Sequence, residues 1–576
     1  GGTMFDLVIR DGLIVDGTGK PAYRGDVAVS DGRIAEVGRQ AGPGRREIRA
    51  GGQLITPGFV DVHTHYDGQA TWDGQLAPSS WHGVTTIVMG NCSVGFAPVR
   101  PDQHDFLIEM MEGVEDIPGI ALHEGISWEW ETFPDYLDHL DRVPRAIDVG
   151  AQATHAAMRA YVMGDRGAAN EPATADDLSS MTRMVREAIH AGALGLTSSR
   201  ADVHRTSKGA HIPGYGVGAD ELVALAQAVG ETGKGAIGVN LDFLDEDDDF
   251  GLLRRLKRVS SRPVWFLLTQ MNDDPQKYAR LLDRMAQSTA EGEEVLCQVA
   301  GRPIGFLLGL ESSLNPFISR PSYKRIANLS LAERVTALRD PEFRAQLMSE
   351  RRSHKSDIMR TVTTRFDRMF RLGDPPDYEP PAEASIAAKA EREGLDPQEV
   401  ALDVLLERDG HELLFMPALN YAEGDFGAIE RMMAHPNAIL GLSDGGAHCG
   451  LICDASTPTY MLSHWARDRS RGPKISLEAA VRKQTSETAA LYGLNDRGRV
   501  AEGYKADLNV IDFEHLRLCA PEMVYDLPAG GRRLVQRAEG FRAIVNGGEV
   551  TFENGEATGA MPGRLVRGGQ AAPATR

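Results

Sequence analysis

Short apolar runs alternate with longer amphipathic stretches through the middle of the chain. Eight runs follow one another: Phe59–Val62, Thr85–Met89, Ile147–Ala151, Ala193–Leu196, Ala236–Val239, Val264–Leu268, Val295–Val299 and Ala438–Leu442. Apolar strands that alternate with helices are typical of βα units around a parallel sheet. Eight such units predict an α/β fold, the (β/α)₈ barrel.

The two ends of the chain have a different pattern. Near the start, four short β-prone runs are separated by Gly and Asp, which favour tight turns: Phe5–Arg10, Leu13–Val15, Asp26–Val29 and Arg33–Val37. Similar runs return at Asp507–Asp512, Ala543–Asn546 and Glu549–Phe552. We therefore expect residues 1–57 and 501–576 to form one small β-sandwich from both chain ends.

A long segment separates the seventh and eighth apolar runs. It is rich in Arg, Glu and Pro, and its pattern predicts helices over Leu331–Leu338, Pro341–Arg351, Ile386–Glu393 and Pro397–Glu407. Because it is too long for a loop, we expect residues 300–435 to be a helical insertion over the barrel mouth. The barrel would then use 58–299 for strands one to seven, and 436–500 for strand eight and the final helices.

Composition narrows the class of protein. Hydrophobic residues make up 42% and charged residues 25%, as in globular proteins, and the net charge of -20 disfavours nucleic acid and anionic membranes as partners. Cys92, Cys297, Cys449, Cys453 and Cys519 show no CxxC spacing, and no apolar stretch is long enough to span a membrane. We expect a cytoplasmic protein with a small-molecule substrate, and a homo-oligomer remains open.

The strongest chemical signal is an HxH motif at the end of the first predicted strand. Residues two apart in a strand face the same side, so His63 and His65 point together from a carboxyl end, where TIM barrels place catalytic residues. Two neutral imidazoles on one face suit a divalent metal such as zinc. The alternative is two polar residues that merely end a strand.

A second signal is the segment SDGGAH after the eighth strand. Asp444 would lie beside the first strand once the barrel closes, where a carboxylate can hold a metal and take a proton from water. Since this segment also has good turn chemistry, Asp444 could instead cap the following loop. The neighbouring HxH motif favours the functional interpretation.

These motifs resemble those of a known family. ITPGFVDVHTHYD (Ile55–Asp67), GVTTIVMGNC (Gly83–Cys92) and SDGGAH resemble the amidohydrolase superfamily, and most of all its D-aminoacylase, or N-acyl-D-amino-acid deacylase, branch. The chain ends, with AEGYKADLNVID (Ala501–Asp512), are similar to the β-sandwich of that superfamily. The resemblance implies amide hydrolysis, with N-acyl amino acids as the substrate class.

The resemblance also implies metal ligands, which this chain retains only in part. Cys92 occupies the place of a ligand cysteine at the end of the second strand, although a buried structural thiol is the alternative. The family's histidines at the ends of strands five and six are absent. Asn240 stands near the first position and Thr269 or Gln270 near the second. We therefore expect one ion, held by His63, His65, Asp444 and Cys92.

Four polar side chains are candidates for substrate contacts. His155 follows the third strand and Arg200 the fourth, where a guanidinium fork suits a substrate carboxylate. Asn240 ends the fifth strand, and His448 follows Asp444 by four residues. The alternative for His155 is a hydrogen bond within a loop, and the alternative for Arg200 is a solvated position at the surface.

The sequence is compatible with three functions. The first is a metal-dependent hydrolase of an amide bond, with one zinc-like ion that polarises the carbonyl and activates water, and with Asp444 as general base. The second keeps the metal but hydrolyses a lactone or ester, or acts on a carbon–carbon bond. The third is a binding or scaffold protein without a metal.

Overall fold

The computed structural model describes residues 4–350 and 356–574. The last residue of the predicted helix Pro341–Arg351 lies outside this range. Within it, the eight predicted apolar runs form the barrel strands β6 (Phe59–Asp61), β7 (Val84–Met89), β8 (Asp148–Ala151) with β9 (Ala153–Thr154), β10 (Gly195–Ser199), β11 (Ala236–Asn240), β12 (Val264–Leu267), β13 (Leu296–Val299) and β17 (Ala438–Leu440). The predicted (β/α)₈ barrel is confirmed.

The barrel closes between its first and last strands. Two parallel sheets make it, β6-β7-β8 and β17-β13-β12-β11-β10-β9, and the continuous segment β8–β9 joins them on one side. On the other side, the Asp444 amide donates to the His63 carbonyl over 3.1 Å, and Thr64 bridges Gly445 in parallel. Closure therefore brings the end of strand eight against the HxH motif.

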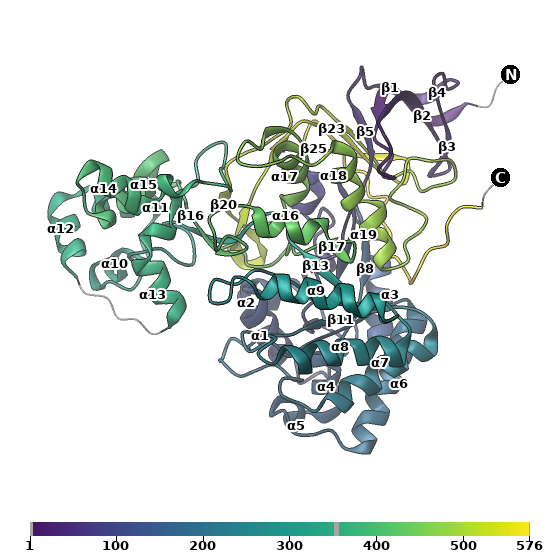
Figure 1. Cartoon of the computed structure of the whole chain (residues 1–576), viewed down its shortest axis with the longest axis horizontal. Helices are drawn as coiled ribbons and strands as arrows, with labels where there is room; N and C mark the ends of the chain where they lie inside the picture. The colour runs from purple at the N-terminus through teal and green to yellow at the C-terminus, as the bar shows by residue number, and fades with distance from the viewer. Residues whose placement is uncertain (1–3, 351–355, 575–576) are drawn as a thin grey trace.

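Helices cover the barrel between successive strands. They are α1 (His104–Glu115), α2 (Gly119–Gly125), α3 (Phe133–Arg142), α4 (His155–Met163), α5 (Asp165–Ala168), α6 (Ala175–Ala191), α7 (Ala219–Thr232), α8 (Glu246–Ser260), α9 (Lys277–Ala290), α16 (Gly427–Ala434), α17 (Thr457–Tyr460), η5 (Met461–Asp468), α18 (Leu477–Lys483) and α19 (Ser486–Leu491). Figure 1 shows α7, α8 and α9 side by side on one flank of the barrel. No helix in the described residues is long and apolar enough to cross a membrane.

Both chain ends contribute to one β-domain, as expected. Its sheet has the order β25-β24-β23-β18-β5-β1-β2-β3, with β4 beside β1. The strands are β1 (Phe5–Ile14), β2 (Tyr23–Ser30), β3 (Arg33–Gly38), β4 (Gly44–Arg49), β5 (Leu54–Pro57), β18 (Leu508–Ile511), β23 (Phe541–Asn546), β24 (Glu549–Glu553) and β25 (Glu556–Ala557). Figure 1 shows the N- and C-terminal ends on the same side of the molecule.

One predicted turn in this domain is wrong. Asp11-Gly12 does not separate two strands but lies inside β1, where the pairing with β2 shifts register between Ile9 and Gly12. Asp11 has φ 56°, and its amide donates to Asp26 Oδ1 over 2.8 Å. A β-bulge uses the same residue types as a turn, which explains the error.

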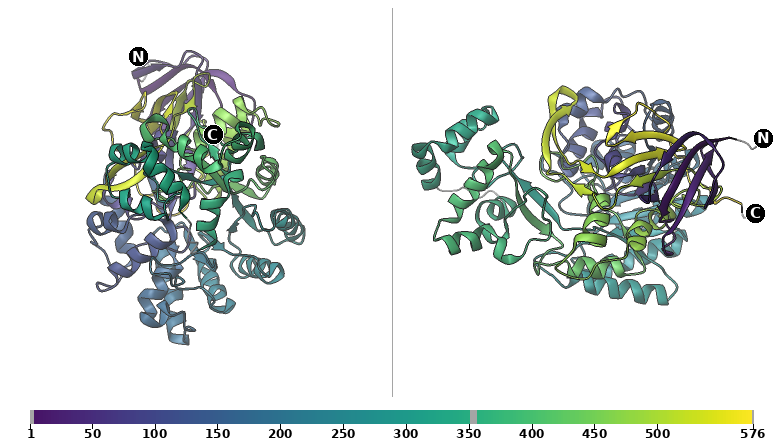
Figure 2. Two further views of the ribbon diagram at one scale, coloured as in Figure 1. Left: turned by 90° about the vertical axis from the view of Figure 1, so that its left-hand side faces the viewer. Right: turned by 90° about the horizontal axis from the view of Figure 1, so that it is seen from above.

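The insertion is not purely helical. It begins with β14 (Ile304–Leu308), which pairs antiparallel with β16 (Leu414–Leu419), and β16 pairs with β15 (Phe370–Arg371). Its helices, which share a hydrophobic core of their own, are α10 (Pro321–Ile326), α11 (Leu331–Arg339), α12 (Pro341–Ser349), α13 (Asp357–Thr364), α14 (Ile386–Glu393) and α15 (Pro397–Gly410). Figures 1 and 2 show these helices standing away from the barrel rather than lying flat on it.

A hairpin from the C-terminal part reaches across to the insertion. It consists of β20 (Glu522–Leu527) and β21 (Gly531–Val535), between β19 (Arg517–Leu518) and β22 (Ala538–Glu539). Arg532 donates to the Glu311 carbonyl over 2.8 Å, and the Leu534 amide donates to the Cys449 carbonyl over 2.6 Å. The hairpin thus connects the base of the insertion with the loop after β17.

Candidate metal centre

The HxH motif leaves β6 with both imidazoles on one side. The Thr64 amide and hydroxyl both bond to the Val88 carbonyl of β7, at 3.1 and 2.8 Å, so Thr64 faces the neighbouring strand. His63 and His65 point the other way, fully buried, with ring centroids 5.1 Å apart. The two-residue period of an extended chain therefore brings both imidazoles together, as the sequence predicts.

Asp444 lies between the two histidines. Its Oδ1 is 3.3 Å from His63 Nε2 and 3.2 Å from His65 Nε2, and its side chain is 13% exposed. The His65 amide donates to the Gly445 carbonyl over 2.7 Å, which keeps the HxH segment and the loop after β17 in register. The ends of strands one and eight thus supply three side chains whose possible metal-donor atoms converge.

Cys92 joins this cluster from the end of β7. Its Sγ is 3.7 Å from His63 Nε2, and the side chain is buried. The backbone reaches this position in a left-handed conformation, with φ 59° at Cys92 and 67° at Ser93. The Ser93 amide is fixed by Thr197 Oγ1 of β10 at 3.1 Å. Cys92, the ligand cysteine that the family resemblance implies, therefore lies beside the two imidazoles.

Glu115, the last residue of α1, is a fifth member that the sequence analysis missed. Its Oε2 lies 3.2 Å from His65 Nε2, and its side chain is 3% exposed. A signal was present: Leu107, Met111 and Glu115 follow one another at four-residue spacing, so an acidic residue continues the buried face of a helix. We refer to His63, His65, Cys92, Glu115 and Asp444 as the site cluster.

Left-handed backbone conformations gather at the site cluster. Besides Cys92, positive φ angles occur at Asp116 (50°), Asp444 (51°) and His448 (51°). Non-glycine residues adopt this region rarely, and such residues concentrate at functional sites, where the surrounding structure maintains them. The backbone strain at these four positions is therefore consistent with a functional site at the site cluster.

The electrostatics of the site cluster fit a cation. Burial lowers the pKa of His63 to about 4, so its imidazole is neutral at neutral pH. Burial opposes ionisation of Asp444, but the hydrogen bond from His65 and the nearby imidazoles lower its pKa to about 2. Burial raises the pKa of the Cys92 thiol to about 12, so a thiolate there requires a cation beside it.

A buried amide orients His63. Gln298 of β13 lies with its Oε1 2.9 Å from His63 Nδ1, and its side chain is fully buried. An amide oxygen accepts only, so Nδ1 donates and the lone pair of Nε2 faces the site cluster. Partners of this kind are usual behind metal-binding histidines.

Two groups of His, Cys, Asp and Glu in the described residues have donor atoms close enough to hold an ion. They are His63 with His65 and Cys92, and His65 with Glu115 and Asp444. His65 belongs to both groups, so the two groups lie side by side. Since Glu115 Oε1 is also buried without a hydrogen-bond partner, the donor set fits a divalent metal.

Of the four expected substrate contacts, His448 is the one for which the structure gives a contact with this centre. His448 is adjacent, with Nε2 3.6 Å from Glu115 Oε2. Asn240 ends β11 with a buried Nδ2 that has no partner, and its carbonyl accepts from the Arg200 amide. Arg200 itself donates to the Val217 carbonyl over 2.7 Å.

His155 is held in the wall of the barrel. Its Nδ1 lies 2.8 Å from Ser198 Oγ, and its Nε2 lies 2.8 Å from Glu221 Oε2. With both nitrogens engaged and 1% of the residue exposed, the structure does not bring His155 to the site cluster.

Strands β11 and β12 add no imidazole to the centre. Gln270, which follows β12, donates to Glu423 Oε2 over 2.7 Å and accepts from the Ala422 amide over 3.1 Å. The side chain of Gln270 is thus hydrogen-bonded to the segment after β16. Trp265 of β12 instead packs edge-on to His63, with ring centroids 6.4 Å apart.

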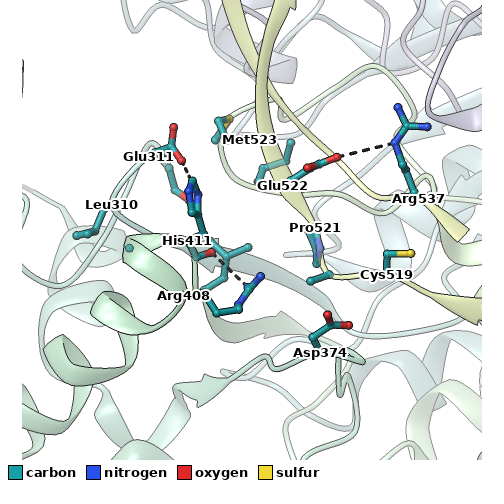
Figure 3. A pocket seen from close by; sticks show the side chains of 15 residues that line it. Leu310, Glu311, Asp374, Arg408, His411, Cys519, Pro521, Glu522, Met523 and Arg537 are labelled. Carbon is teal, nitrogen blue, oxygen red and sulfur yellow. Dashed lines mark hydrogen bonds and ion pairs between the residues drawn. The ribbon is translucent and has the colours of Figure 1, made fainter. Parts of the chain in front are cut away.

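A cavity outside the metal centre lies between the insertion and the C-terminal hairpin. It measures about 410 Å³ and is lined by parts of the insertion and of the C-terminal hairpin, including Glu311, His411, Cys519, Glu522 and Arg537. Figure 3 shows Glu311 directed at His411, and Glu522 directed at Arg537. None of the site cluster lines it, so this cavity is separate from the metal centre.

Comparison with known proteins agrees with this architecture. The model of the amidohydrolase family matches residues 46–552. The chain is 27% identical over 579 residues to N-acyl-D-aspartate deacylase of Alcaligenes xylosoxydans xylosoxydans, covering 99% of this chain and 96% of that one. D-aminoacylase of the same organism is 26% identical over 581 residues, with 98% and 97% covered.

A solved structure shares the fold. N-acyl-D-glutamate deacylase from Bordetella bronchiseptica, determined with zinc and a phosphonate inhibitor, superposes with a TM-score of 0.65 at 22% identity, over 98% of this chain and 100% of that one. Because the family match spans most of the chain, this protein belongs to the amidohydrolase family and is similar to its D-aminoacylase branch.

Proposed function

We propose that this chain hydrolyses the amide bond of an N-acyl amino acid, using one divalent ion, zinc, held by His63, His65, Asp444 and Cys92. The observation that carries this proposal is the convergence of two imidazoles, a carboxylate and a thiol from β6, β7 and the end of β17. The substrate class follows the names of relatives that match along nearly the whole chain. When bound, such an ion polarises the scissile carbonyl and lowers the pKa of water to about 7.

Asp444 has two oxygens in different surroundings, which suits two tasks. Oδ1 faces His63 and His65, whereas Oδ2 lies 3.9 Å from His448 Nε2, on the side of a partly exposed imidazole. Ionised at neutral pH, Asp444 accepts at Oδ2 the proton that the attacking water loses. It then gives this proton to the leaving nitrogen as the carbonyl–nitrogen bond breaks, releasing a carboxylic acid and a free amine.

The rim offers partners for the rest of the substrate. We assign the substrate carboxylate to Arg200, because its guanidinium lies on the loop after β10 and presents several donors in a plane. His448 and Asn240 are assigned to the polar atoms of the amide. His155 receives no such role, since Ser198 and Glu221 occupy its ring nitrogens.

A substrate panel tests this function. The zinc-equilibrated protein should release free amine from an N-acyl-D- or N-acyl-L-amino acid, and a chelator should stop the release. Simple lactones, aryl esters and small aromatic amides form the comparison set. Turnover of lactones or esters alone would replace the amide assignment with the second hypothesis, and no turnover with zinc bound would contradict it.

A further inference from the structure

The Glu115 carboxylate reaches the site cluster from outside the barrel strands. Oε2 lies 3.2 Å from His65 Nε2 and 3.6 Å from His448 Nε2, while Oε1 is buried with no hydrogen-bond partner. A carboxylate withdrawn from water is costly unless hydrogen bonds or a cation compensate it. Two imidazoles alone leave one oxygen of Glu115 uncompensated.

Backbone hydrogen bonds fix the main chain at Glu115. The His448 amide donates to the Glu115 carbonyl over 2.6 Å, and the Cys449 amide donates to the Asp116 carbonyl over 3.1 Å. Asp116 ends α1 in a left-handed conformation with φ 50°. The loop after β17 that carries Asp444 therefore also fixes the main chain of Glu115. The positions of both carboxylates thus depend on the same loop.

The opposite side of the centre supplies few donors. Gln270 is turned to Glu423 and Ala422, and Asn240 offers an amide, a weak ligand for zinc. Glu115 and Asp444, by contrast, lie with His65 in one group of converging donor atoms. Glu115 thus adds a fifth donor, from α1, to the four that lie at the ends of strands one, two and eight.

We propose that Glu115 is a direct ligand of the ion, so that α1 completes a centre begun by strands one, two and eight. This inference rests on the proposed function, because it requires that the site cluster holds a metal. Two carboxylate ligands make the donor set harder than one of imidazole and thiolate alone. The centre should therefore accept Mn²⁺ and Co²⁺ as well as Zn²⁺.

A crystal structure of the zinc-loaded protein tests the ligand directly. An anomalous peak with a Glu115 oxygen about 2.0–2.2 Å away, the usual zinc–carboxylate distance, is the expected result. If the ion is held by His63, His65 and Asp444 while both Glu115 oxygens stay beyond about 3 Å, this inference is overturned and the proposed function is not. If the zinc-equilibrated crystal has no ion in the site cluster, both fail.

Variants add a solution readout. Glu115→Gln should weaken Co²⁺ affinity at least tenfold in a competition with a metallochromic chelator, and should change the d–d absorption of the Co²⁺-loaded protein. The matched control Glu109→Gln, on the same helix and paired with Lys208, should change neither. Unaltered affinity and absorption in Glu115→Gln would contradict the inference.

Folding is checked separately. The melting temperature of the metal-free Glu115→Gln protein shows whether the variant is folded, since the metal cannot contribute there. If it does not fold, Glu115→Asp decides: this variant keeps a carboxylate that is one methylene shorter. It should bind Co²⁺ more weakly than the wild type but with carboxylate-type absorption, and wild-type affinity in Glu115→Asp would argue against a direct bond.

Discussion

The amide of His448 donates a hydrogen bond to the carbonyl of Glu115 over 2.6 Å. Together with the bond from the Cys449 amide to the Asp116 carbonyl, this contact joins the end of α1 to the loop that follows the eighth strand, four residues beyond Asp444. Displacement of this loop would therefore move both carboxylates relative to His65. The geometry of the centre depends on the closure between strands one and eight and on this helix end.

Asp444→Asn should abolish most of the activity while the fold remains. An amide cannot accept the proton of the attacking water, and general-base catalysis contributes about 10²–10⁴-fold. Amine release under saturating substrate measures the loss in kcat. Asp425 accepts a hydrogen bond from the Gly427 amide at the start of α16. Asp425→Asn serves as the control and should keep full activity. Wild-type kcat in Asp444→Asn would remove this residue from the mechanism.

Cys92→Ser should remove a sulfur ligand. In the Co²⁺-loaded protein, a thiolate ligand gives a charge-transfer band in the near ultraviolet that a serine oxygen cannot give. We expect this band in the wild type. The control Cys519→Ser should also show it, because Cys519 lines the cavity outside the metal centre. Its presence in Cys92→Ser would show that the thiol of Cys92 is not a ligand.

Gln298→Met should weaken metal binding without touching a ligand. The methionine has a similar size, but its sulfur is only a weak acceptor, so the hydrogen bond that fixes the tautomer of His63 is weakened. Partners behind metal-binding histidines typically contribute about 10–100-fold to affinity. A chelator competition measures the change, with Gln287→Met on the surface of α9 as a control. Equal affinities in all three proteins would contradict the orienting role.

Asp148 should make the stability of the protein acid-sensitive. It lies at the start of β8, fully buried, 2.7 Å from Arg497 Nη1 and 3.1 Å from Lys505 Nζ. Burial opposes its ionisation, but Lys505 and Arg497 bring its pKa below the ordinary value of 3.8. Its contribution is thus complete above that ordinary pKa and is lost as the pH falls through the lower, folded-state pKa.

Asp148→Asn should therefore destabilise the protein by about 3 kcal/mol at neutral pH, because Arg497 and Lys505 each lose one of two carboxylate partners and keep only Asp496 and Asp507. The difference from the wild type should shrink as the wild-type carboxylate becomes protonated at low pH. Thermal unfolding of both proteins over a pH series measures it. A difference that stays constant down to the lowest pH would show that the charge of Asp148 does not contribute.

The barrel could be predicted because its signals are local. Each apolar run is short, bounded and separated by a helical stretch, and His63 and His65 follow from the two-residue period of a strand. Asp444 followed from the order of strands, since a closed barrel places the first beside the last. The strands and the two histidines need only the pattern of residues near each position, whereas Asp444 also needs the count of strands around the barrel.

The parts that were missed depend on contacts distant in sequence. Glu115 is separated from Asp444 by most of the chain, and only the backbone bonds to His448 and Cys449 bring it into the centre. Gln298 is a single polar residue in an apolar run, and its contact with His63 is 235 residues distant in sequence. The strand β14 that opens the insertion is paired with β16, far along the chain, so its local sequence did not reveal it.

The most direct test of this account is the metal content of the purified protein after equilibration with zinc and removal of unbound ion. Elemental analysis should give about one equivalent of zinc per chain. The His63→Ala and His65→Ala proteins, confirmed as folded, should retain much less. No retained metal in the wild type, or an equal amount in all three proteins, would contradict a centre built on these two imidazoles.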